Sequence, residues 1–140
     1  MLRRLTPLLV LAAALVLALP AAATSPSTTL QGYAADTWRS FDMMLNPATG
    51  LPSDNVSAEG VRARYTSPTN IATYLWSTIA ARDLGLISPA QARARIERTL
   101  TTLARMERHK RSGQYYNWYD PDTGKKLTKW PVDGSPVYPF

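Results

Sequence analysis

Two Ser-Pro pairs constrain the fold of this 140-residue chain more than any other feature. Serine is a favoured helix N-cap and proline a favoured first helical residue, so Ser67–Pro68 and Ser88–Pro89 each predict the start of a helix. Gly85 predicts the end of the first helix, because glycine readily adopts the positive φ of the position that follows a helix. Only Leu86–Ile87 lies between Gly85 and the second start. A link this short predicts two antiparallel neighbouring helices, an αα-hairpin.

The two helices of this hairpin differ in the share of their surface that is apolar. The helix that starts after Ser67 is apolar nearly all round, which is typical of a helix buried on more than one side. Trp76 lies on it at helical spacing and is predicted to be a core residue. The helix that starts after Ser88 has a single apolar stripe, and Gln91 completes a capping box with its N-cap. We expect this second helix to continue to about Gly113.

A further helix is predicted over residues 29–45, where apolar side chains recur at steps of three or four. Trp38 follows this spacing and is also predicted to be a core residue. Pro47 and Gly50 end the helix, because proline cannot continue its hydrogen bonding and glycine favours a turn. Residues 51–66 are predicted to form a loop. Together these patterns predict an all-α fold.

The first 23 residues have the three parts of a secretory signal peptide. Arg3–Arg4 provides a basic start, residues 8–19 form an unbroken apolar run, and Ala21–Ala23 offers small residues for cleavage. The apolar run is shorter than the roughly 20 residues that a transmembrane helix needs, and an uncleaved anchor is the alternative. We therefore expect residues 1–23 to be removed and the product to be secreted or periplasmic, without a stable membrane anchor. Residues 24–29 are predicted to be a flexible leader.

Composition excludes several kinds of site. The chain has no cysteine and one histidine, His109, so disulfide scaffolds, catalytic thiols and multi-histidine metal centres are excluded. We expect neither a metal site nor a cofactor. Lys and Arg outnumber Asp and Glu by 16 to 10, and part of this excess is a cationic cluster at residues 105–111. The negative end of the predicted helix explains that cluster, and the export signal argues against a nucleic-acid partner.

The character of the sequence changes after Gly113. Residues 114–120, QYYNWYD, contain four aromatic side chains, which is too dense for an amphipathic helix. The turn at residues 120–124 repeats the Asx-Pro-x-Thr-Gly pattern of residues 46–50. In both turns the Asx side chain can cap the backbone and glycine can adopt positive φ. Two ordinary turns built from preferred turn residues explain the likeness better than a true repeat does.

Five motifs occur in order along residues 35–125: TWRSF at 37–41, GLPSDN at 50–55, TSPTNI at 66–71, AARDLG at 80–85 and NWYD at 117–120. In this order they resemble the N-terminal part of bacterial glucoamylase-like proteins, the (α/α)6-barrel family whose relatives process β-1,2-glucans. The resemblance implies a partial (α/α)6 toroid with about three main helices and an aromatic-rich loop. Residues 30–140 would then be the N-terminal portion of a helical-toroid carbohydrate-active domain that is truncated at its C-terminus.

The resemblance also implies glycoside hydrolysis or a related carbohydrate activity, in a sugar cleft formed by loops at the helix ends. Hydrolysis needs a pair of carboxyl groups. We assign no catalytic residue, because the family's pair can lie wholly beyond Phe140. An oligo- or polysaccharide is the expected partner. The candidate substrate-binding residues are Asp54, Asn55, Thr69, Asn70, Tyr116, Asn117, Trp118, Tyr119 and Asp120.

These candidates also have structural explanations. An aromatic wall beside Asp120 suits an acid or a sugar contact, whereas turn chemistry favours an Asx cap. Asp54 can likewise cap its loop, and Thr69 and Asn70 can cap backbone amides at the start of a helix. Two of the four aromatic side chains in residues 114–120 are expected to be core.

Three functions are consistent with these patterns. The first is an exported, glycoside hydrolase-like protein that acts on a glucan and is represented by its N-terminal part. The second is a non-catalytic sugar-binding or envelope-associated helical module, in which YNWYD is a stacking platform. The third is a degraded gene product without function.

Overall fold

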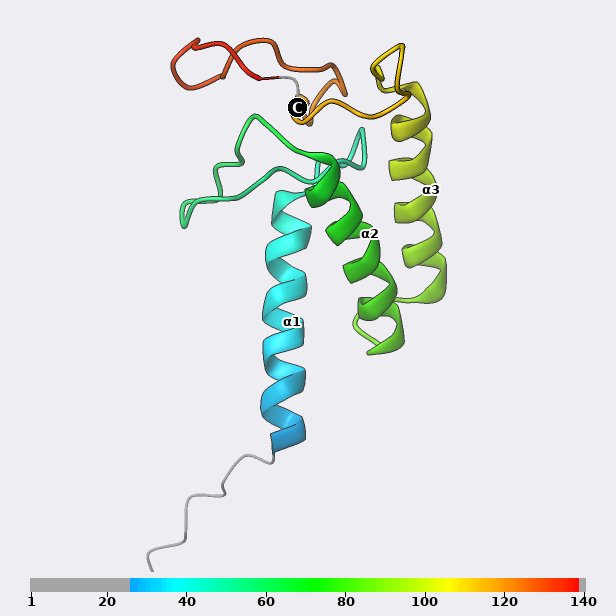
Figure 1. Cartoon of the computed structure of the whole chain (residues 1–140). Helices are drawn as coiled ribbons and strands as arrows, with labels where there is room; N and C mark the ends of the chain where they lie inside the picture. Colours follow the sequence, from blue (N-terminus) through cyan, green and yellow to red (C-terminus); the bar gives the residue numbers. More distant parts are fainter. Residues whose placement is uncertain (1–25, 139–140) are drawn as a thin grey trace, which may run out of the picture.

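The computed structural model describes residues 26–138. Three helices, α1 (Pro26–Met44), α2 (Pro68–Asp83) and α3 (Pro89–Arg105), lie side by side, and long loops gather at one end of them (Figure 1). Within the described residues no strand forms and the only β structure is isolated bridges, so the all-α prediction is confirmed. The predicted signal peptide lies outside the described residues.

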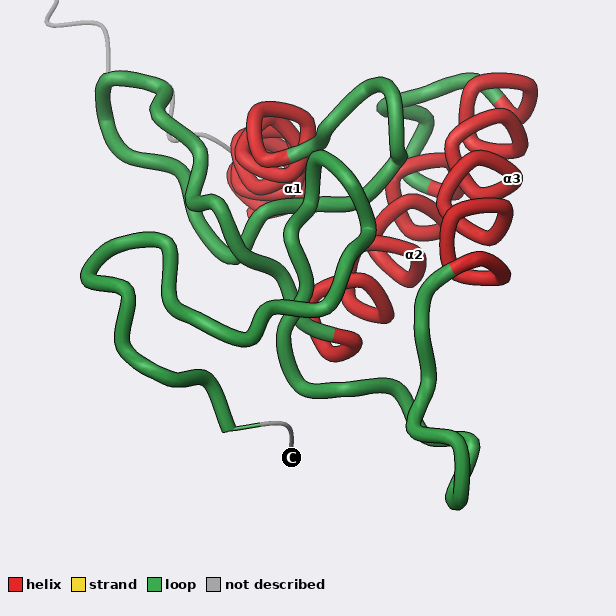
Figure 2. The backbone as a smooth tube through the Cα atoms, turned by 90° about the horizontal axis from the view of Figure 1, so that it is seen from above, coloured by secondary structure: helices red, strands yellow, loops and turns green. Residues whose placement is uncertain are grey.

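The loops that gather at this end form a layer over the helix ends, as the view from above shows (Figure 2). We call residues 45–67 and 106–138 the loop layer. It follows the C-termini of α1 and α3 and precedes the N-terminus of α2, so residues from distant parts of the sequence meet there.

The αα-hairpin predicted from the two Ser-Pro pairs is confirmed. The Ser67 hydroxyl accepts a hydrogen bond from the Asn70 backbone N–H, and Ser88 and Gln91 form the full capping box. Gly85 follows α2 with a φ of 71°. Because a residue with a Cβ disfavours this conformation, glycine is the residue that lets the chain reverse here.

Two helix boundaries differ from the predicted ones. α1 begins at Pro26, so residues 26–29, predicted to be flexible, belong to the helix. α3 ends at Arg105 rather than near Gly113, because Met106 adopts extended backbone with a ψ of 138°. Gly113 instead closes a turn, in which its N–H donates to the His109 carbonyl over 2.8 Å.

The core lies where α2 and α3 meet the loop layer. Leu51, Ile71, Met106 and Tyr119 are all buried and form one cluster. Only Ile71 belongs to a helix, and the other three come from the loops. The loop layer is therefore part of the hydrophobic core rather than a covering of it.

The two helical tryptophans have different environments. Trp38 on α1 is half-buried and stacks on Tyr74 of α2, with ring centroids 6.3 Å apart. Trp76 is 76% exposed, so the prediction that it is a core residue is wrong. α2 turns Tyr74, Thr78 and other residues toward its neighbours and leaves Trp76 in solvent.

Four hairpins of one design make up most of the loop layer. Antiparallel bridges of equal spacing close them, at Leu45–Pro52, Arg108–Tyr115, Tyr119–Lys126 and Lys129–Pro136. In each, a five-residue turn ends on a glycine with positive φ, whose N–H donates to the carbonyl of the first turn residue. The likeness between residues 46–50 and 120–124 thus extends to two further turns with other sequences, which a shared turn geometry explains.

Candidate functional site

Three aromatic rings from separate loops meet on the loop layer. Tyr65 contacts Trp118 and Trp130 edge-on, with centroid distances of 5.6 and 5.3 Å, and the two indoles are 5.0 Å apart. Tyr65 precedes α2. Trp118 lies just before the hairpin closed by Tyr119 and Lys126, and Trp130 lies in the hairpin closed by Lys129 and Pro136. Edge-to-face packing of this kind stabilises the cluster and leaves part of each ring accessible, since both tryptophans and the tyrosine are half-buried.

These rings line an open pocket of about 470 Å³, which we call the aromatic cleft. Its polar lining consists of Asp54, Asp133 and Ser135, and Val132 adds an apolar side chain. A concave surface with aromatic walls and a few polar groups is the usual form of a small-molecule site.

Asp54 is held in the cleft by two amides. Asn70 donates from Nδ2 to Asp54 Oδ1 over 2.7 Å, and Asn55 donates to Oδ2 over 3.2 Å. Asn70 lies in the first turn of α2, where the Ser67 cap fixes its backbone. The Asp54 backbone N–H also donates to the Tyr65 carbonyl. The start of α2 therefore fixes the position of this carboxylate beside the aromatic rings.

Asp133 is the second carboxylate of the cleft, and its turn keeps it ionised. The Ser135 backbone N–H and hydroxyl both donate to Asp133 Oδ1, over 2.9 and 2.7 Å. These bonds stabilise the charged form and lower the pKa of Asp133. An ionised carboxylate accepts hydrogen bonds and is suited to sugar hydroxyls.

The structure brings part of the predicted set together at the cleft. Asp54 and Trp118 line it, and Asn70 and Asn55 bind Asp54. Thr69 is exposed one residue before Asn70, and Asn117 is exposed one residue before Trp118. Neither Thr69 nor Asn117 lines the cleft.

The other three predicted residues have different surroundings. Tyr119 is fully buried, accepts from the Tyr116 backbone N–H and donates to the Glu107 carbonyl over 2.6 Å. Burial raises the pKa of its hydroxyl. Tyr116 is half-buried beneath Lys126, whose Nζ lies 4.3 Å from the ring centroid. Asp120 Oδ1 accepts from Asp122 N–H and from Thr123, so Asp120 caps its turn.

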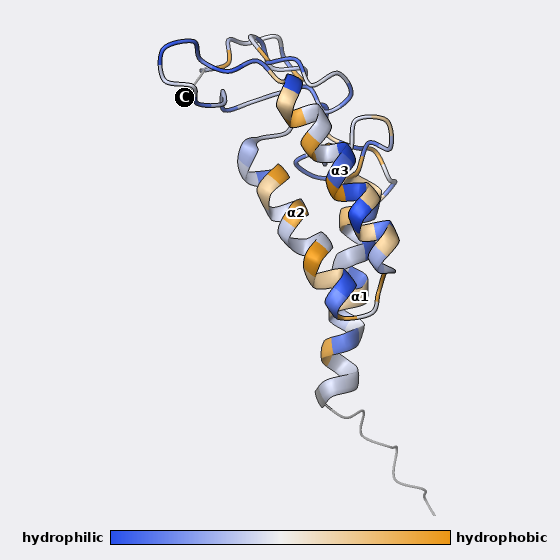
Figure 3. Ribbon diagram, turned by 90° about the vertical axis from the view of Figure 1, so that its right-hand side faces the viewer, coloured by the Kyte–Doolittle hydropathy of each residue, from blue (hydrophilic) through white to orange (hydrophobic). Residues whose placement is uncertain are grey.

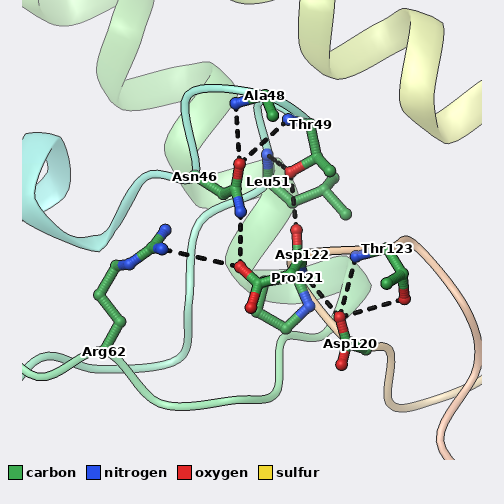
Figure 4. Close-up of polar contacts among 9 residues, drawn as sticks. All are labelled: Asn46, Ala48, Thr49, Leu51, Arg62, Asp120, Pro121, Asp122 and Thr123. Carbon is green, nitrogen blue, oxygen red and sulfur yellow. Dashed lines mark hydrogen bonds and ion pairs between the residues drawn. The ribbon is translucent and has the colours of Figure 1, made fainter.

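The turn that Asp120 caps is joined to its counterpart at residues 46–50 (Figure 4). Asn46 donates from Nδ2 to Asp122 Oδ1, and the Thr49 hydroxyl donates to the Pro121 carbonyl over 2.7 Å. Arg62 adds an ion pair to Asp122 at 3.6 Å. The hairpin that follows Trp118 is thus bound to the hairpin that follows α1.

Sequence reasoning missed Tyr65, Trp130 and Asp133. Tyr65 stands just before the Thr66-Ser67-Pro68 helix start, and Trp130 and Asp133 lie in a Pro- and Gly-containing tail. Tyr65 shares a loop with Asp54, and the bridge between Thr66 and Tyr119 brings that loop beside Trp118. No local pattern in the sequence predicts a pairing between segments so far apart.

In the described part of the chain, no group of three or more His, Cys, Asp or Glu side chains is placed to hold a metal ion. None of α1, α2 and α3 is both long and apolar enough to cross a membrane.

Comparison with known proteins found a relative in sequence and a relative in structure. Over 93 residues it is 38% identical to the cyclic β-(1,2)-glucan synthase NdvB of Rhizobium meliloti, which covers 64% of this chain and 3% of that protein. A solved structure of a candidate glucoamylase from Bacteroides caccae matches 76% of this chain and 27% of that one, with a TM-score of 0.57 and 22% identity. The chain spans a small part of each relative.

The solved structure shows a shared fold, which confirms the all-α, glucoamylase-like architecture that the motifs imply. The family model described as a protein of unknown function, DUF3131, matches residues 32–127. Because this match covers well over half of the sequence, the chain belongs to the DUF3131 family.

Proposed function

We propose that the loop layer binds a neutral glucan in the aromatic cleft. The observation that carries the proposal is that three aromatic rings from three loops meet at one open pocket, beside two carboxylates. Tyr65, Trp118 and Trp130 lie outside the buried core cluster and the side chains packed against it. A site for a ligand would account for their convergence at the surface.

The lining of the cleft is chemically suited to a sugar. The C–H faces of a pyranose ring pack on aromatic side chains, which supply a large apolar surface with a defined geometry. The hydroxyl groups at the ring edge need acceptors and donors. Asp54 and Asp133 provide acceptors, and Ser135 provides a hydroxyl. This combination favours a neutral, hydroxyl-rich ligand over a purely apolar one.

The relatives support glucose polymers as the ligand class. The names of the synthase and of the candidate glucoamylase both concern glucans. We therefore propose gluco-oligosaccharides as ligands, with β-1,2-linked chains as the first to test, because the relative of higher identity is named for that linkage.

We propose further that binding takes place outside the cytoplasm. The three-part pattern of residues 1–23 supports export. The intact mass of the native protein tests it: cleavage after Ala23 leaves a product of about 13 kDa. A recovered mass of 15.5 kDa, that of the whole chain, would contradict cleavage.

Hydrolysis of the bound glucan is the second candidate, because Asp54 and Asp133 share one pocket. Glycosidases pair a protonated carboxyl group with an ionised one. In this cleft Asp133 is held ionised by Ser135, and Asp54 accepts bonds from two amides. Both carboxyl groups are arranged as acceptors rather than as proton donors, so the geometry supports binding better than turnover.

Calorimetric titration with β-1,2-linked gluco-oligosaccharides tests the binding proposal. Trp118→Ala removes one cleft wall and should weaken affinity at least tenfold, as expected for a central aromatic contact. Trp76→Ala is the matched control, because Trp76 is an exposed tryptophan on α2. Equal affinities of the two variants, with circular dichroism showing both folded, would contradict the proposal. Release of reducing ends during incubation would favour hydrolysis over binding alone.

A further inference from the structure

The positive charge of the molecule is concentrated in one part of the sequence. Residues 26–97 contain six basic and six acidic side chains, whereas residues 98–138 contain eight basic and four acidic ones. The mild overall excess therefore belongs to the end of α3 and to the hairpins that follow it. Figure 3 shows hydrophilic stretches running through these loops.

The helix end explains only one of these charges. α3 stops at Arg105, so Arg105 alone lies in its last turn and interacts with the negative end of the helix. Arg108, Lys110 and Arg111 belong to the hairpin closed by Arg108 and Tyr115. The prediction that the helix dipole accounts for the cationic cluster at residues 105–111 is therefore wrong for most of these side chains. Arg108, Lys110 and Arg111 need another explanation.

Contacts join this hairpin to the next one. Tyr116 contacts the His109 ring, with centroids 6.4 Å apart, and also lies beneath Lys126. Lys126 in turn forms a 2.7 Å ion pair with Glu107, just after α3. Arg105, Lys125 and Lys126 line one open pocket of about 450 Å³.

We call the resulting surface the basic hairpin surface. It has two parts: the basic side chains of the hairpin that Arg108 and Tyr115 close, which are Arg108, Lys110 and Arg111, and those that line the adjoining pocket, which are Arg105, Lys125 and Lys126. Glu107 is the carboxylate that contacts it, through Lys126. Arg105, Lys110, Arg111 and Lys125 form no ion pair with any described residue. Four cations are thus available to an external anion.

We propose that the basic hairpin surface binds an acidic polysaccharide, through anionic groups repeated along its chain. Unpaired Lys and Arg side chains on adjoining hairpins match a polymer with regularly spaced carboxylate or sulfate groups. Thr123 and Thr128 line the same pocket as Lys125 and can bond sugar hydroxyls. The surface shares no lining residue with the aromatic cleft, so the two sites can bind different ligands.

Two other polyanions fit the surface less well. Single-stranded nucleic acid binds by stacking its bases on open aromatic faces, but Arg108 covers Tyr115 at 4.4 Å and Lys126 covers Tyr116. Peripheral membrane binding gains from apolar side chains that enter the lipid. Among the described residues, no exposed large hydrophobic side chain lies between Arg105 and Lys129.

The test measures binding of the full chain to polygalacturonate, dextran sulfate and neutral dextran at low and moderate ionic strength. We expect both anionic polymers to bind with an affinity that falls steeply with salt. Any binding of neutral dextran, a glucan that the aromatic cleft can accept, should not change with salt. A preference for polygalacturonate identifies carboxylates as the anionic groups that bind. A preference for dextran sulfate identifies sulfate groups. The triple variant Lys110→Ser/Arg111→Ser/Lys125→Ser should lose at least tenfold in affinity and show a flatter salt dependence.

The matched control is Arg39→Ser/Arg82→Ser/Arg93→Ser, which removes the same charge from exposed positions on α1, α2 and α3. It should stay within threefold of the unmodified chain. Equal losses in the two triple variants would show that net charge alone attracts the polymer and would overturn the proposal. Tighter binding to single-stranded DNA or to anionic phospholipid vesicles than to either polysaccharide would also overturn it. The Lys110→Ser/Arg111→Ser/Lys125→Ser variant should bind gluco-oligosaccharides with unchanged affinity. This result separates the test of the basic hairpin surface from that of the aromatic cleft.

Discussion

The α2–α3 pair and the loop layer of this protein are built on different principles. The starts of α2 and α3 are fixed by neighbours in sequence, such as the Ser88–Gln91 capping box. The loop layer is fixed by contacts across the sequence, such as the hydrogen bonds from Asn46 to Asp122 and from Thr49 to Pro121. Local rules therefore define the scaffold, and non-local contacts define the surface that carries both proposed sites.

The largest expected effect comes from the residue that unites the two regions. Tyr119→Ala removes a fully buried ring from the core cluster, together with the hydroxyl that bonds Glu107 and Tyr116. We expect a loss of about 3–5 kcal/mol in the free energy of unfolding, measured by urea denaturation. Tyr119→Phe should retain most of the stability and lose about 1–3 kcal/mol. If Tyr119→Ala cost less than Tyr119→Phe, the ring would not hold the loop layer in place.

A second test concerns the contact between the first turn and α3. A Cβ at Gly50 would lie 2.9 Å from the Thr99 backbone nitrogen, and the φ of 71° disfavours a side chain as well. Gly50→Ala should lower the free energy of unfolding by about 2–4 kcal/mol. The clash with the backbone adds to the cost of the positive φ. Gly113→Ala has a similar φ but open space around it, so it should cost only about 1 kcal/mol. Equal thermal stabilities of these two variants would mean that the turn at Gly50 does not pack closely against α3.

The helix pair should respond more weakly to loss of a cap. Ser88→Ala removes the hydroxyl that accepts from the Gln91 N–H and should cost about 1 kcal/mol. Ser88→Asp keeps an acceptor at the N-cap and should retain stability. Thermal denaturation followed by far-ultraviolet circular dichroism measures the stability of both variants. A loss in Ser88→Ala as large as that in Gly50→Ala would contradict the view that the cap acts locally.

The smallest expected effect is a pH dependence at the edge of the loop layer. The pKa of Asp133 is lowered in the folded chain, so its hydrogen bonds to Ser135 stabilise the turn above the ordinary carboxyl pKa. That contribution is lost as the pH falls through the lowered pKa. The Ser135 amide resonance should shift during an acid titration by NMR, and Asp133→Asn should abolish the shift. A midpoint above the ordinary carboxyl range would contradict this account.

Structure fixed by local contacts could be predicted from the sequence, whereas structure fixed by contacts between distant segments could not. Ser67, Gly85 and Ser88 act on adjacent backbone groups, so the αα-hairpin could be read from the sequence. The end of α3 could not, because Met106 leaves the helix to join a core with Leu51 and Tyr119. In the cleft, Asp54 and Trp118 were predicted from their motifs. Tyr65 meets Trp118 through the bridge between Thr66 and Tyr119, and Trp130 contacts both rings from a later hairpin.

NMR of the tryptophan indoles tests the central claim, that the aromatic cleft is the glucan site. The chain has four tryptophans. Trp118 and Trp130 line the cleft, and Trp38 and Trp76 lie on the helices. During titration with a β-1,2-linked gluco-oligosaccharide, the indole N–H resonances of Trp118 and Trp130 should shift together while those of Trp38 and Trp76 stay in place. Shifts confined to Trp38 or Trp76, or no shift at saturating ligand, would contradict the account.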